Sequence, residues 1–542
     1  MASVDTPSSA GPGPSLHPSL ARLSEEQAAK YGSRPAVIFE DREYSYAEVH
    51  RRVLVRAARL RSWGIGKGDR VAYLGSNHPG LVSALLACLR TGAIFIPLNW
   101  RLAPAELDHQ LAAADVSVLI VAPEHEALAD ATTVPVERHP LQWEAVTDAD
   151  LANPPSLAEI AADAPEGSHV EEGLTAEDPA FILFTSGTTG HAKGAVLHHG
   201  NIIWNAFNII LDTDMSAKDV TLASAPLFHV AALNQQVMTS YIRGATTVFL
   251  PKWQADEVFD NVGKYGVTWL FGVTTMFADL VDSPRWESAD LSTLRFVNSG
   301  GAPIPVKLIN DFLERGIAFC QGYGLTETAP GATFLTAEDA LRKPGSAGRA
   351  VPFADVKVVG ADGGQLPPGE RGEILVRGPN VIKSYWDNET ATREAFHADG
   401  WFRTGDIGYM DDEDYLYIVD RIKDMYISGG ENVYPAEVEE VLFGHPDVGE
   451  VAVVADPDHR WGEVGHAYVV AKPGSEPIPE DIISYATQRL AKYKVPKIVT
   501  FLDDLPRTGS GKVHKPKLRG SGPLGAHSAH SAHSAHGTDS ND

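Results

Sequence analysis

The chain has 542 residues, 44% hydrophobic and 21% charged, so it has the composition of a globular protein and enough length for more than one hydrophobic core. Its 71 acidic side chains outnumber the 45 basic ones, and a net charge of −26 argues against nucleic acid and anionic membranes as partners. No stretch reaches 18 consecutive apolar residues, and the N-terminus lacks the basic and apolar regions of a signal peptide. We therefore expect neither a membrane span nor secretion.

The chain contains 2 cysteines, Cys88 and Cys320, which are far apart in the sequence and belong to no Cys/His cluster. This pattern indicates neither a disulfide framework nor a structural zinc site. A reducing, cytoplasmic setting is the expectation that fits it.

Short β-rich runs alternate with amphipathic helices from residue 36 onward. A strand is expected at 36–39, and a helix begins at the capping box formed by Ser45 and Glu48. Further strands are expected at 71–74, 94–97 and 116–121, and a helix at 81–89 separates the first two. This alternation predicts a mostly parallel sheet covered by helices.

The same rhythm resumes between about residues 220 and 320, and hairpin-like strands with Gly/Asp turns follow after about residue 350. A last α/β segment occupies about 425–518. We therefore expect an α/β protein, with a large N-terminal domain of mixed, mostly parallel sheets, a small antiparallel β subdomain and a small α+β C-terminal domain.

The two ends of the chain are predicted to be disordered, because residues 1–17 are rich in Pro, Gly and Ser and residues 519–542 contain an Ala-His-Ser repeat. The repeated histidines could chelate a transition metal, but a solvated spacer is the preferred interpretation. They are His527, His530, His533 and His536.

The segment 181–197 reads FILFTSGTTGHAKGAVL, an apolar strand that runs into a loop of glycines and hydroxyl residues. Glycines let backbone N–H groups converge on an anion and Lys193 adds a cation, so the loop is predicted to cradle a polyphosphate. It is not a Walker A loop, because Ala192 replaces the second glycine and Gly194 replaces the magnesium-binding hydroxyl residue. The predicted cradle residues are Thr185, Ser186, Gly187, Thr188, Thr189, Gly190 and Lys193.

The segment FTSGTTGHAKG resembles the phosphate loop of the adenylate-forming superfamily, which includes acyl-CoA synthetases, peptide-synthetase adenylation domains and beetle luciferases. The resemblance continues in the family's order and covers about residues 20–518. Its further blocks are SGGAP (299–303), QGYGLTET (321–328), RGEILVRGPNVIKSYW (371–386), GWFRTGD (400–406), DRIKDMYISGGENVYPAEVE (420–439) and PRTGSGKVHK (506–515).

This resemblance implies an ATP-dependent acid–thiol ligase that forms an acyl-adenylate and then a thioester with coenzyme A, with Mg²⁺ as cofactor. It also implies an N-terminal AMP-binding domain at 18–420, a hinge at 421–424 and a mobile C-terminal domain at 425–518. The implied partners are ATP, coenzyme A and a small carboxylic acid, and whether the chain forms a homo-oligomer is left open.

For the nucleotide, the resemblance implies that Tyr323 offers its flat ring to adenine and that Thr326 contacts the phosphate. A carboxylate is a hard oxygen ligand, so Glu327 is implied to bind Mg²⁺ with Thr185. Asp406 is implied to bind the ribose, with Arg421 beside it. The remaining implied nucleotide contacts are Gly301, Ala302, Pro303, Gln321, Gly322 and Gly324.

Lys512 is implied to bridge the substrate carboxylate and the α-phosphate, which makes it the leading candidate for catalysis. Lys423 occupies the family's hinge position, where the C-terminal domain rotates after adenylation. Rotation is implied to replace Lys512 with a channel for coenzyme A. The residues expected to line that channel are Ser428, Gly429, Gly430 and Glu431.

The acyl group is expected to be hydrophobic and to lack an amine, because Phe228 and His229 stand where amino-acid-activating domains carry an Asp. Apart from Asn234 and a gating His229, the pocket mapped by the resemblance is apolar and contains no Arg for a second carboxylate. We expect a medium- or long-chain fatty acid or a hydrophobic aryl acid, hence a role in fatty acid or lipid metabolism. The pocket residues are His229, Val230, Leu233, Asn234, Phe271, Gly272, Val273, Met276 and Ala329.

Two alternatives stay open at this stage. The chain could be an acyl-AMP ligase that loads a carrier protein in a biosynthetic pathway. It could also be a nucleotide-binding sensor that has lost catalysis, but such a protein should have lost at least one charged site residue. All five are intact, namely Lys193, Glu327, Asp406, Arg421 and Lys512.

Overall fold

A computed structural model describes residues 19–141, 164–185, 192–301, 304–428, 431–508 and 512–519. The predicted disordered segments at the two chain ends lie outside these ranges, apart from Arg519. The chain divides into two compact units: unit 1 falls within 1–357, 375–404 and 414–416, and unit 2 within 358–374, 405–413 and 417–542. Among the described residues, no helix combines the length and the apolar character needed to cross a membrane.

One sheet of unit 1 has the order β6-β5-β3-β4-β7-β8, and β3 pairs parallel with both β4 and β5. The predicted strands in this region are confirmed, with ends that differ by one or two residues. Strand β8 turns back antiparallel to β7 and forms the hairpin that carries the phosphate loop. The bounds are β3 (Arg70–Leu74), β4 (Ile94–Leu98), β5 (Val118–Val121), β6 (Glu137–Pro140), β7 (Pro179–Thr185) and β8 (Lys193–His198).

The second sheet has the order β15-β14-β13-β12-β11-β9-β10-β1-β2. Its inner strands are parallel, whereas β2 at one end and β14 and β15 at the other are antiparallel, which confirms the expected mostly parallel arrangement. The bounds are β1 (Pro35–Phe39), β2 (Arg42–Ser45), β9 (Val220–Ala223), β10 (Thr246–Phe249), β11 (Trp269–Gly272), β12 (Phe296–Gly300), β13 (Ala318–Tyr323), β14 (Thr333–Leu335) and β15 (Arg349–Ala350).

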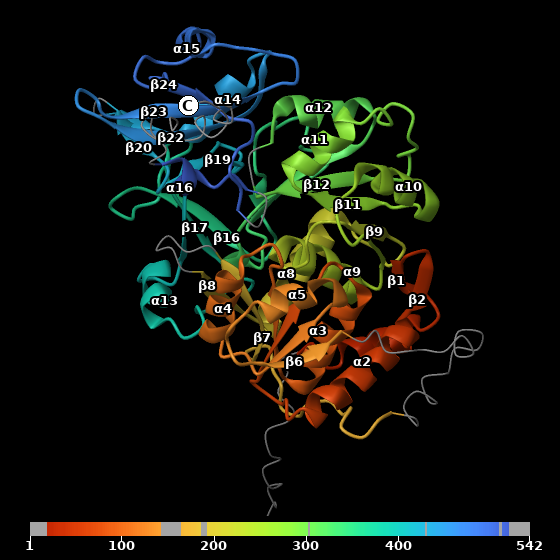
Figure 1. Cartoon of the computed structure of the whole chain (residues 1–542). Helices are drawn as coiled ribbons and strands as arrows, with labels where there is room; N and C mark the ends of the chain where they lie inside the picture. The colour runs from red at the N-terminus through yellow and green to blue at the C-terminus, as the bar shows by residue number, and fades with distance from the viewer. Residues whose placement is uncertain are drawn as a thin grey trace, which may run out of the picture. The chain divides into compact units, whose positions relative to one another are not determined.

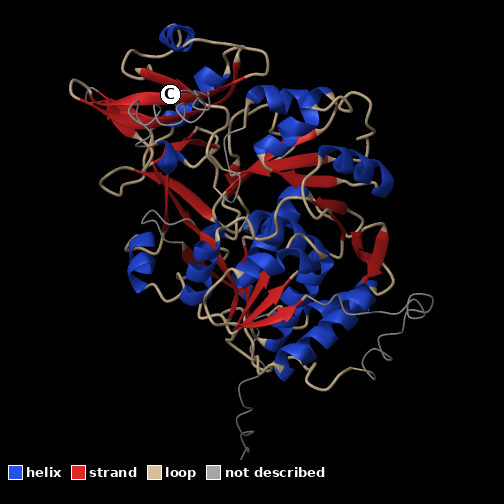
Figure 2. Cartoon of the chain, in the orientation of Figure 1, coloured by secondary structure: helices blue, strands red, loops and turns tan. Residues whose placement is uncertain are grey.

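Helices pack against these sheets, and Figure 1 shows α10, α11 and α12 beside β11 and β12. Figure 2 shows the same alternation of helices and strands by colour. The helices of unit 1 are α1 (Leu23–Tyr31), α2 (Tyr46–Ser62), α3 (Pro79–Thr91), α4 (Pro104–Ala113), α5 (Glu126–Asp130), α8 (His199–Thr213), α9 (Thr239–Arg243), α10 (Ala255–Tyr265), α11 (Thr274–Asp282), α12 (Val306–Glu314) and α13 (Glu389–Ala395), with the 3₁₀ turns η1 (Pro123–His125) and η3 (Thr326–Thr328) and the π-helix η2 (Ala231–Met238).

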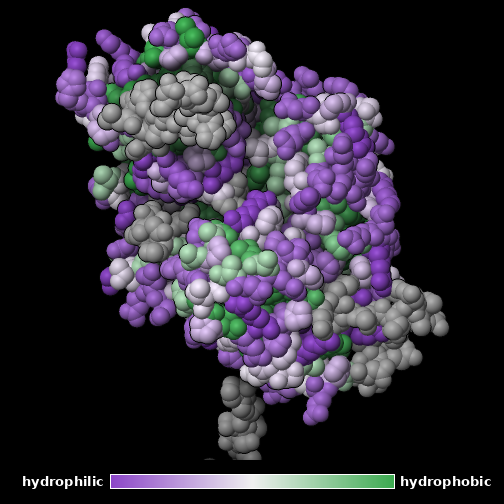
Figure 3. Space-filling model, in the orientation of Figure 1, coloured by the Kyte–Doolittle hydropathy of each residue, from purple (hydrophilic) through white to green (hydrophobic). Residues whose placement is uncertain are grey.

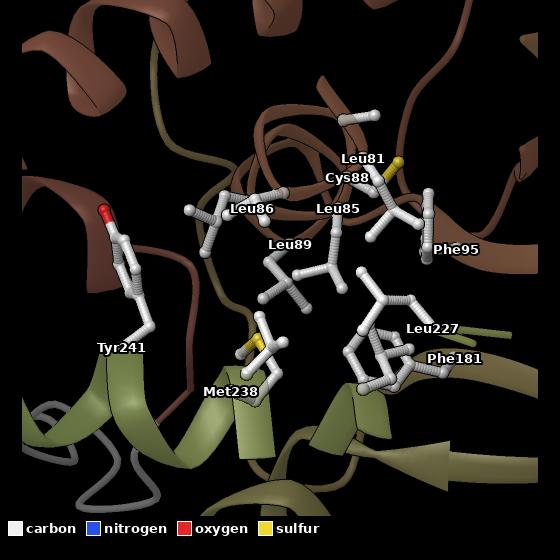
Figure 4. Packing of buried hydrophobic residues seen from close by; sticks show 14 of the residues in the cluster. Leu81, Leu85, Leu86, Cys88, Leu89, Phe95, Phe181, Leu227, Met238 and Tyr241 are labelled. Atoms are coloured by element: carbon white, nitrogen blue, oxygen red, sulfur yellow. The ribbon is translucent and has the colours of Figure 1, made fainter. Parts of the chain in front are cut away.

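Local sequence explains the best-predicted helices. Helix α2 begins at Ser45, whose hydroxyl accepts the Glu48 N–H while the Glu48 carboxylate accepts the Ser45 N–H, so the predicted capping box is confirmed. Helix α3 is apolar on every side and is buried along its whole length, ending at Gly92 in the left-handed conformation. Its leucines pack against Phe95, Phe181, Leu227 and Met238 in the main core of unit 1 (Figure 4).

A four-stranded sheet in the order β16-β17-β18-β19 comes from the region where hairpin-like strands were predicted. Unit 2 holds the sheet β21-β20-β23-β22, with β24 paired to β23, and its core lies around Tyr426, Val438 and Val453. The bounds are β16 (Asp355–Val359), β17 (Gly372–Arg377), β18 (Phe402–Met410), β19 (Leu416–Arg421), β20 (Tyr426–Ser428), β21 (Glu431–Val433), β22 (Val448–Asp458), β23 (Gly462–Ala471), β24 (Ile498–Phe501), α14 (Pro435–Phe443), α15 (Pro479–Thr487) and α16 (Lys515–Leu518).

The surface drawn in Figure 3 is mostly hydrophilic. Beneath it, one buried side chain joins the two sheets of unit 1. Asn77, which follows β3 and is 4% exposed, donates to the carbonyl oxygens of Ala225 (3.0 Å) and Leu250 (3.2 Å). Its own amide oxygen accepts the Leu227 N–H at 3.0 Å. Asn77 therefore fixes the segment that leads into the residues expected to hold the acyl group.

We expect Asn77→Ala to lower the free energy of unfolding of unit 1 by about 2–3 kcal/mol, because it leaves buried backbone groups without partners. Thermal and urea unfolding monitored by circular dichroism would measure the loss. Asn261→Ala is the matched control, since the Asn261 amide donates only within helix α10, to the Glu257 carbonyl oxygen at 2.7 Å. Equal stability of the two variants would contradict the role of Asn77.

Candidate active site

The β7–β8 hairpin holds the two ends of the predicted phosphate loop. Thr185 and Lys193 are directly opposite partners in this antiparallel pair, while the loop residues Ser186 to Gly190 lie outside the described ranges. His109 Nε2 lies 3.2 Å from the carbonyl oxygen of Ala192, at the second end of the loop. A cavity of about 260 Å³ adjoins Lys193 and is also lined by His109, Phe184, Trp386 and Asp387.

Glu327 lies in the turn η3 and is 7% exposed. The Tyr385 hydroxyl donates to Glu327 Oε1 at 2.8 Å, and Thr185 Oγ1 lies 3.5 Å from the same oxygen. The backbone of Glu327 is also held, because its carbonyl oxygen accepts the Ile382 N–H at 2.8 Å. The structure thus brings together Thr185 and Glu327, which the resemblance names as the magnesium ligands.

Tyr385 contacts the predicted site residue Glu327 and was not predicted from the sequence, although it lies within one of the blocks that carry the resemblance. Burial raises the pKa of its hydroxyl, and the negative charge of Glu327 raises it further, so the hydroxyl keeps its proton at neutral pH. The contact with Glu327 is therefore a donated hydrogen bond. Tyr385 and Glu327 are separated by 58 residues in the sequence, so residue spacing could not predict that they are in contact.

Buried amides hold the segment that follows Glu327. Asn380 Nδ2 donates to the carbonyl oxygens of Thr328 (2.7 Å) and Gly331 (2.6 Å), and Asn205 Oδ1 accepts the Gly331 N–H at 3.1 Å. Asn201 in turn donates to the carbonyl oxygens on either side of Asn380, at 2.8 and 2.9 Å. These bonds satisfy backbone groups that have no regular secondary structure around them.

The carboxyl ends of β12 and β13 lie side by side, with Ser299 opposite Gln321 and Gly300 opposite Gly322. Asn298, Ser299 and Gln321 are buried there, and Ser299 Oγ, Gln321 Nε2 and both Asn298 amide atoms have no hydrogen-bond partner among the described residues. Because ligands of open α/β sheets bind at carboxyl ends of strands, these polar atoms suit a nucleotide base.

Of the other residues predicted to contact the base, two lie within the described ranges at the ends of these strands. Tyr323 is half-buried at the end of β13, and Gly301 follows β12 with a φ of 87°, a conformation suited to glycine. Ala302 and Pro303 lie outside the described ranges.

The donors beside the phosphate loop fit Mg²⁺. Among the described residues, no three His, Cys, Asp or Glu side chains gather as they would in an all-protein metal site. Mg²⁺ is usually held by one or two carboxylates, with substrate phosphates and water as its other ligands. One carboxylate, Glu327, next to the hydroxyl of Thr185 matches that pattern.

In unit 2, Asp406 is 3% exposed and Arg421 Nε lies 2.9 Å from its Oδ1. Asp406 lies in β18, and the Ile422 N–H donates to the Gly405 carbonyl oxygen at 2.9 Å, so the part of β18 that carries Asp406 is bonded to the residue that follows β19. The two residues that the resemblance assigns to the ribose are therefore neighbours. Burial lowers the pKa of the nearby Lys423, and the charge of Arg421 lowers it further.

The predicted catalytic lysine and the predicted coenzyme A residues also lie in unit 2. Lys512 is exposed, and its carbonyl oxygen accepts the Thr508 N–H at 2.7 Å across a short antiparallel bridge between Arg507 and Val513. Ser428 is buried and pairs with the exposed Glu431 across β20 and β21. Gly429 and Gly430 lie outside the described ranges.

The residues predicted for the acyl group lie along η2, at the end of β11, at the start of α11 and after η3. Asn234 Nδ2 donates to the Ala329 carbonyl oxygen at 2.5 Å, while its own buried Oδ1 has no hydrogen-bond partner among the described residues. The His229 ring lies 4.5 Å from the Phe228 ring. Met276 packs against the main core of unit 1, to which four of the predicted residues belong: Val230, Leu233, Phe271 and Ala329.

Leu233, Asn234 and Ala329 have no exposed surface. The two apolar residues serve as core residues in this structure, whereas Asn234 keeps a buried oxygen without a hydrogen-bond partner among the described residues. Val273 is half-buried at the N-cap of α11. The adjoining Gly272 is buried, and a Cβ added to it would lie 3.2 Å from the nearest atoms of the Phe277 ring. The predicted set therefore contains both partly accessible positions and packing positions.

Comparison with known proteins agrees with this geometry. Residues 24–386 match the family described as AMP-binding enzyme, and residues 437–512 match the AMP-binding enzyme C-terminal domain. A feruloyl-CoA synthase of Amycolatopsis sp is 46% identical over 88% of this chain and 93% of its own. The long-chain-fatty-acid–CoA ligase FadD13 of Mycobacterium tuberculosis is 41% identical over 88% of this chain and 93% of its own.

A solved structure is also similar. The o-succinylbenzoate CoA synthetase of Bacillus subtilis, in complex with its acyl-adenylate intermediate, has 33% sequence identity and a TM-score of 0.82. The similarity covers 92% of this chain and 98% of that one. The two chains therefore share their fold over nearly their whole length.

Gly324 gives a stability test of the site. A Cβ at Gly324 would lie 1.5 Å from the Pro330 carbonyl oxygen and 2.8 Å from Thr328 Oγ1. We expect Gly324→Ala to lower the free energy of unfolding by at least about 3 kcal/mol, because backbone must move to admit the methyl group. Thermal unfolding would measure it.

Gly263→Ala is the control, and it should raise rather than lower the free energy of unfolding. This exposed glycine lies inside α10, and nothing lies within 4 Å of its Cβ position. Alanine forms helix better than glycine and should stabilise the protein by about 0.5–1 kcal/mol. A neutral Gly324→Ala variant would contradict the close contact with Pro330.

Proposed function

Since this chain belongs to the family of AMP-binding enzymes and is an acid–thiol ligase that forms acyl- or aryl-CoA, we propose that its acid is a hydrophobic aryl acid. The observation that best supports ATP use is the placement of Glu327 against Thr185 at the end of the phosphate loop. Buried polar atoms without partners at the ends of β12 and β13 offer a place for the base.

The proposed reaction has two steps. A carboxylate oxygen of the acid attacks the α-phosphorus of ATP, the bond to the β-phosphate oxygen breaks, and pyrophosphate leaves with its electrons. The coenzyme A sulfur then attacks the acyl carbon, AMP leaves, and the thiol proton passes to solvent or base. Lys193 and the loop would bind the phosphates, and Lys512 would stabilise charge at the α-phosphate. Bound Mg²⁺, held by Glu327 and Thr185, would neutralise phosphate charge.

Asn234 supports an aryl acid that carries a hydrogen-bond donor. Its buried Oδ1 has no partner among the described residues, and the resemblance maps Asn234 to the acyl group. An alkyl chain would leave this oxygen unsatisfied, whereas a phenolic hydroxyl or a ring N–H could donate to it. The feruloyl-CoA synthase among the relatives is named for an aryl substrate. A medium- or long-chain fatty acid is the second candidate, supported by the apolar neighbours and by the name of FadD13.

The relatives described above are named as coenzyme A ligases or synthetases, which supports coenzyme A rather than a carrier protein as the acyl acceptor. The cytoplasm is the proposed compartment. Both cysteines are free and buried in the structure, which agrees with a reducing setting.

A panel of acids tests the substrate class through acid-dependent exchange of pyrophosphate into ATP. We expect kcat/KM to rise about fourfold per methylene from acetate towards octanoate, since each buried CH₂ group contributes about 0.8 kcal/mol. The kcat/KM for 4-hydroxycinnamate should exceed that for cinnamate by about tenfold, because its phenolic hydroxyl can donate a hydrogen bond to Asn234 Oδ1. Malonate and free amino acids should be poor.

A preference for acetate, malonate or an amino acid would overturn the hydrophobic substrate class. A preference for octanoate over both cinnamates would select the fatty acid instead. Offering coenzyme A or a purified carrier protein to the same reaction identifies the acceptor.

Lys512→Ala separates the two proposed half-reactions. We expect it to reduce adenylate formation by about 100-fold or more, because the charge at the α-phosphate loses its cation. Thioester formation from supplied acyl-AMP should persist within about threefold, because Lys512 is proposed to act in the first step alone. Lys517→Ala is a control on an exposed lysine of the same segment. Equal loss of both half-reactions in Lys512→Ala would contradict the division.

A further inference from the structure

Tyr385 contacts both charged groups of the predicted triphosphate site. Its hydroxyl donates to Glu327 Oε1 at 2.8 Å, and the Lys193 ammonium lies 5.6 Å from the centre of its ring. Within the described ranges, no ion pair joins Lys193 directly to Glu327. A tyrosine thus lies in contact with two opposite charges that would otherwise attract each other.

The backbone of Tyr385 is fixed by two different elements. It forms an antiparallel bridge with Ala195 in β8, and the following Trp386 N–H donates to the Gly194 carbonyl oxygen at 2.7 Å. The Tyr385 N–H itself donates to Thr392 Oγ1 in helix α13 at 3.0 Å. The ring is therefore attached to the same strand that carries Lys193, and its position follows that of the phosphate-loop hairpin.

Consecutive side chains of this segment pack into different cores. Tyr385 packs against the main core of unit 1, while Trp386 packs against the separate core around Ile96 and Val196. Core packing accounts for the Tyr385 ring but not for its hydroxyl, because a phenylalanine would fill the same apolar space. The hydroxyl is explained by its bond to Glu327.

We propose that Tyr385 is a positioning residue of the triphosphate site, which holds Glu327 and Lys193 apart and in place so that each can act on the phosphates. The proposal rests on the proposed use of ATP. The ring holds the Lys193 ammonium by a cation–π contact at the start of β8, and the hydroxyl orients the Glu327 carboxylate. Neither charge is then neutralised by the other before the nucleotide binds.

The test compares two nucleotides that differ in the phosphates concerned. Dissociation constants of ATP, with Mg²⁺ present, and of AMP are measured by calorimetry on the full chain. Tyr385→Phe removes the hydroxyl and keeps the ring, and we expect it to weaken ATP binding about tenfold, the effect of one hydrogen bond to a charged group. AMP lacks the β- and γ-phosphates, so its binding should stay within about twofold. Tyr385→Leu, which also removes the ring, should weaken ATP binding further.

Tyr265→Phe is the matched control. It removes a hydroxyl that also donates to a carboxylate at 2.8 Å, on the exposed Asp41. We expect its affinities for both nucleotides to equal those of the wild type. Kinetics give a second readout, because the KM for ATP in pyrophosphate exchange should rise in Tyr385→Phe more than the KM for the acid.

The outcomes separate the proposals. Unchanged ATP binding in Tyr385→Phe, or an equal loss of ATP and AMP binding, would overturn the positioning role and leave a packing role. A wild-type chain that binds no ATP would overturn the proposed function itself, before any variant is compared. Melting temperatures recorded alongside show whether each variant is folded.

Discussion

The site depends on one constraint, which is that buried irregular backbone must find hydrogen-bond partners within the protein. The segment after Glu327 belongs to no regular helix or sheet until β14 begins. Amide side chains from α8, from η2 and from the turn at Asn380 supply its partners. Asparagine suits this task because one side chain both donates and accepts. These bonds fix the backbone that follows Glu327, while the Tyr385 hydroxyl contacts the Glu327 carboxylate itself.

The same constraint explains why the functional groups come from distant parts of the sequence. Each buried amide links two chain segments. Asn77 joins the two sheets of unit 1, and Asn380 joins the turn in which it lies to the segment after Glu327. A parallel sheet collects strand ends at one edge, and these amides then fix the loops that leave that edge. The backbone that carries the charged Glu327 side chain is therefore held by neutral amide groups.

Sequence reasoning predicted what depends on neighbouring residues. The Ser45–Glu48 capping box and the parallel strands were found because their signals lie within a few residues. The resemblance found Thr185 and Glu327, which the structure places together. Tyr385 was missed because its role depends on a partner 58 residues away, and periodicity carries no information on such pairs. The unsatisfied Asn234 Oδ1 could not be predicted for the same reason. Only the hydrogen bond from Nδ2 to Ala329 shows that Oδ1 is the amide atom without a partner among the described residues.

The bond between Asn234 and Ala329 has a practical consequence for protein engineering. Asn234 is an obvious target for redesigning acid selectivity, but its amide holds a carbonyl oxygen only two residues beyond Glu327. With the roles proposed above, a substitution at Asn234 would alter the nucleotide side of the reaction together with the acid side. Directed evolution of this scaffold should therefore begin at Val273 and Met276, which are partly accessible and lie on a different element. Diversity at those positions can be explored without removing the hydrogen bond that holds the segment after Glu327.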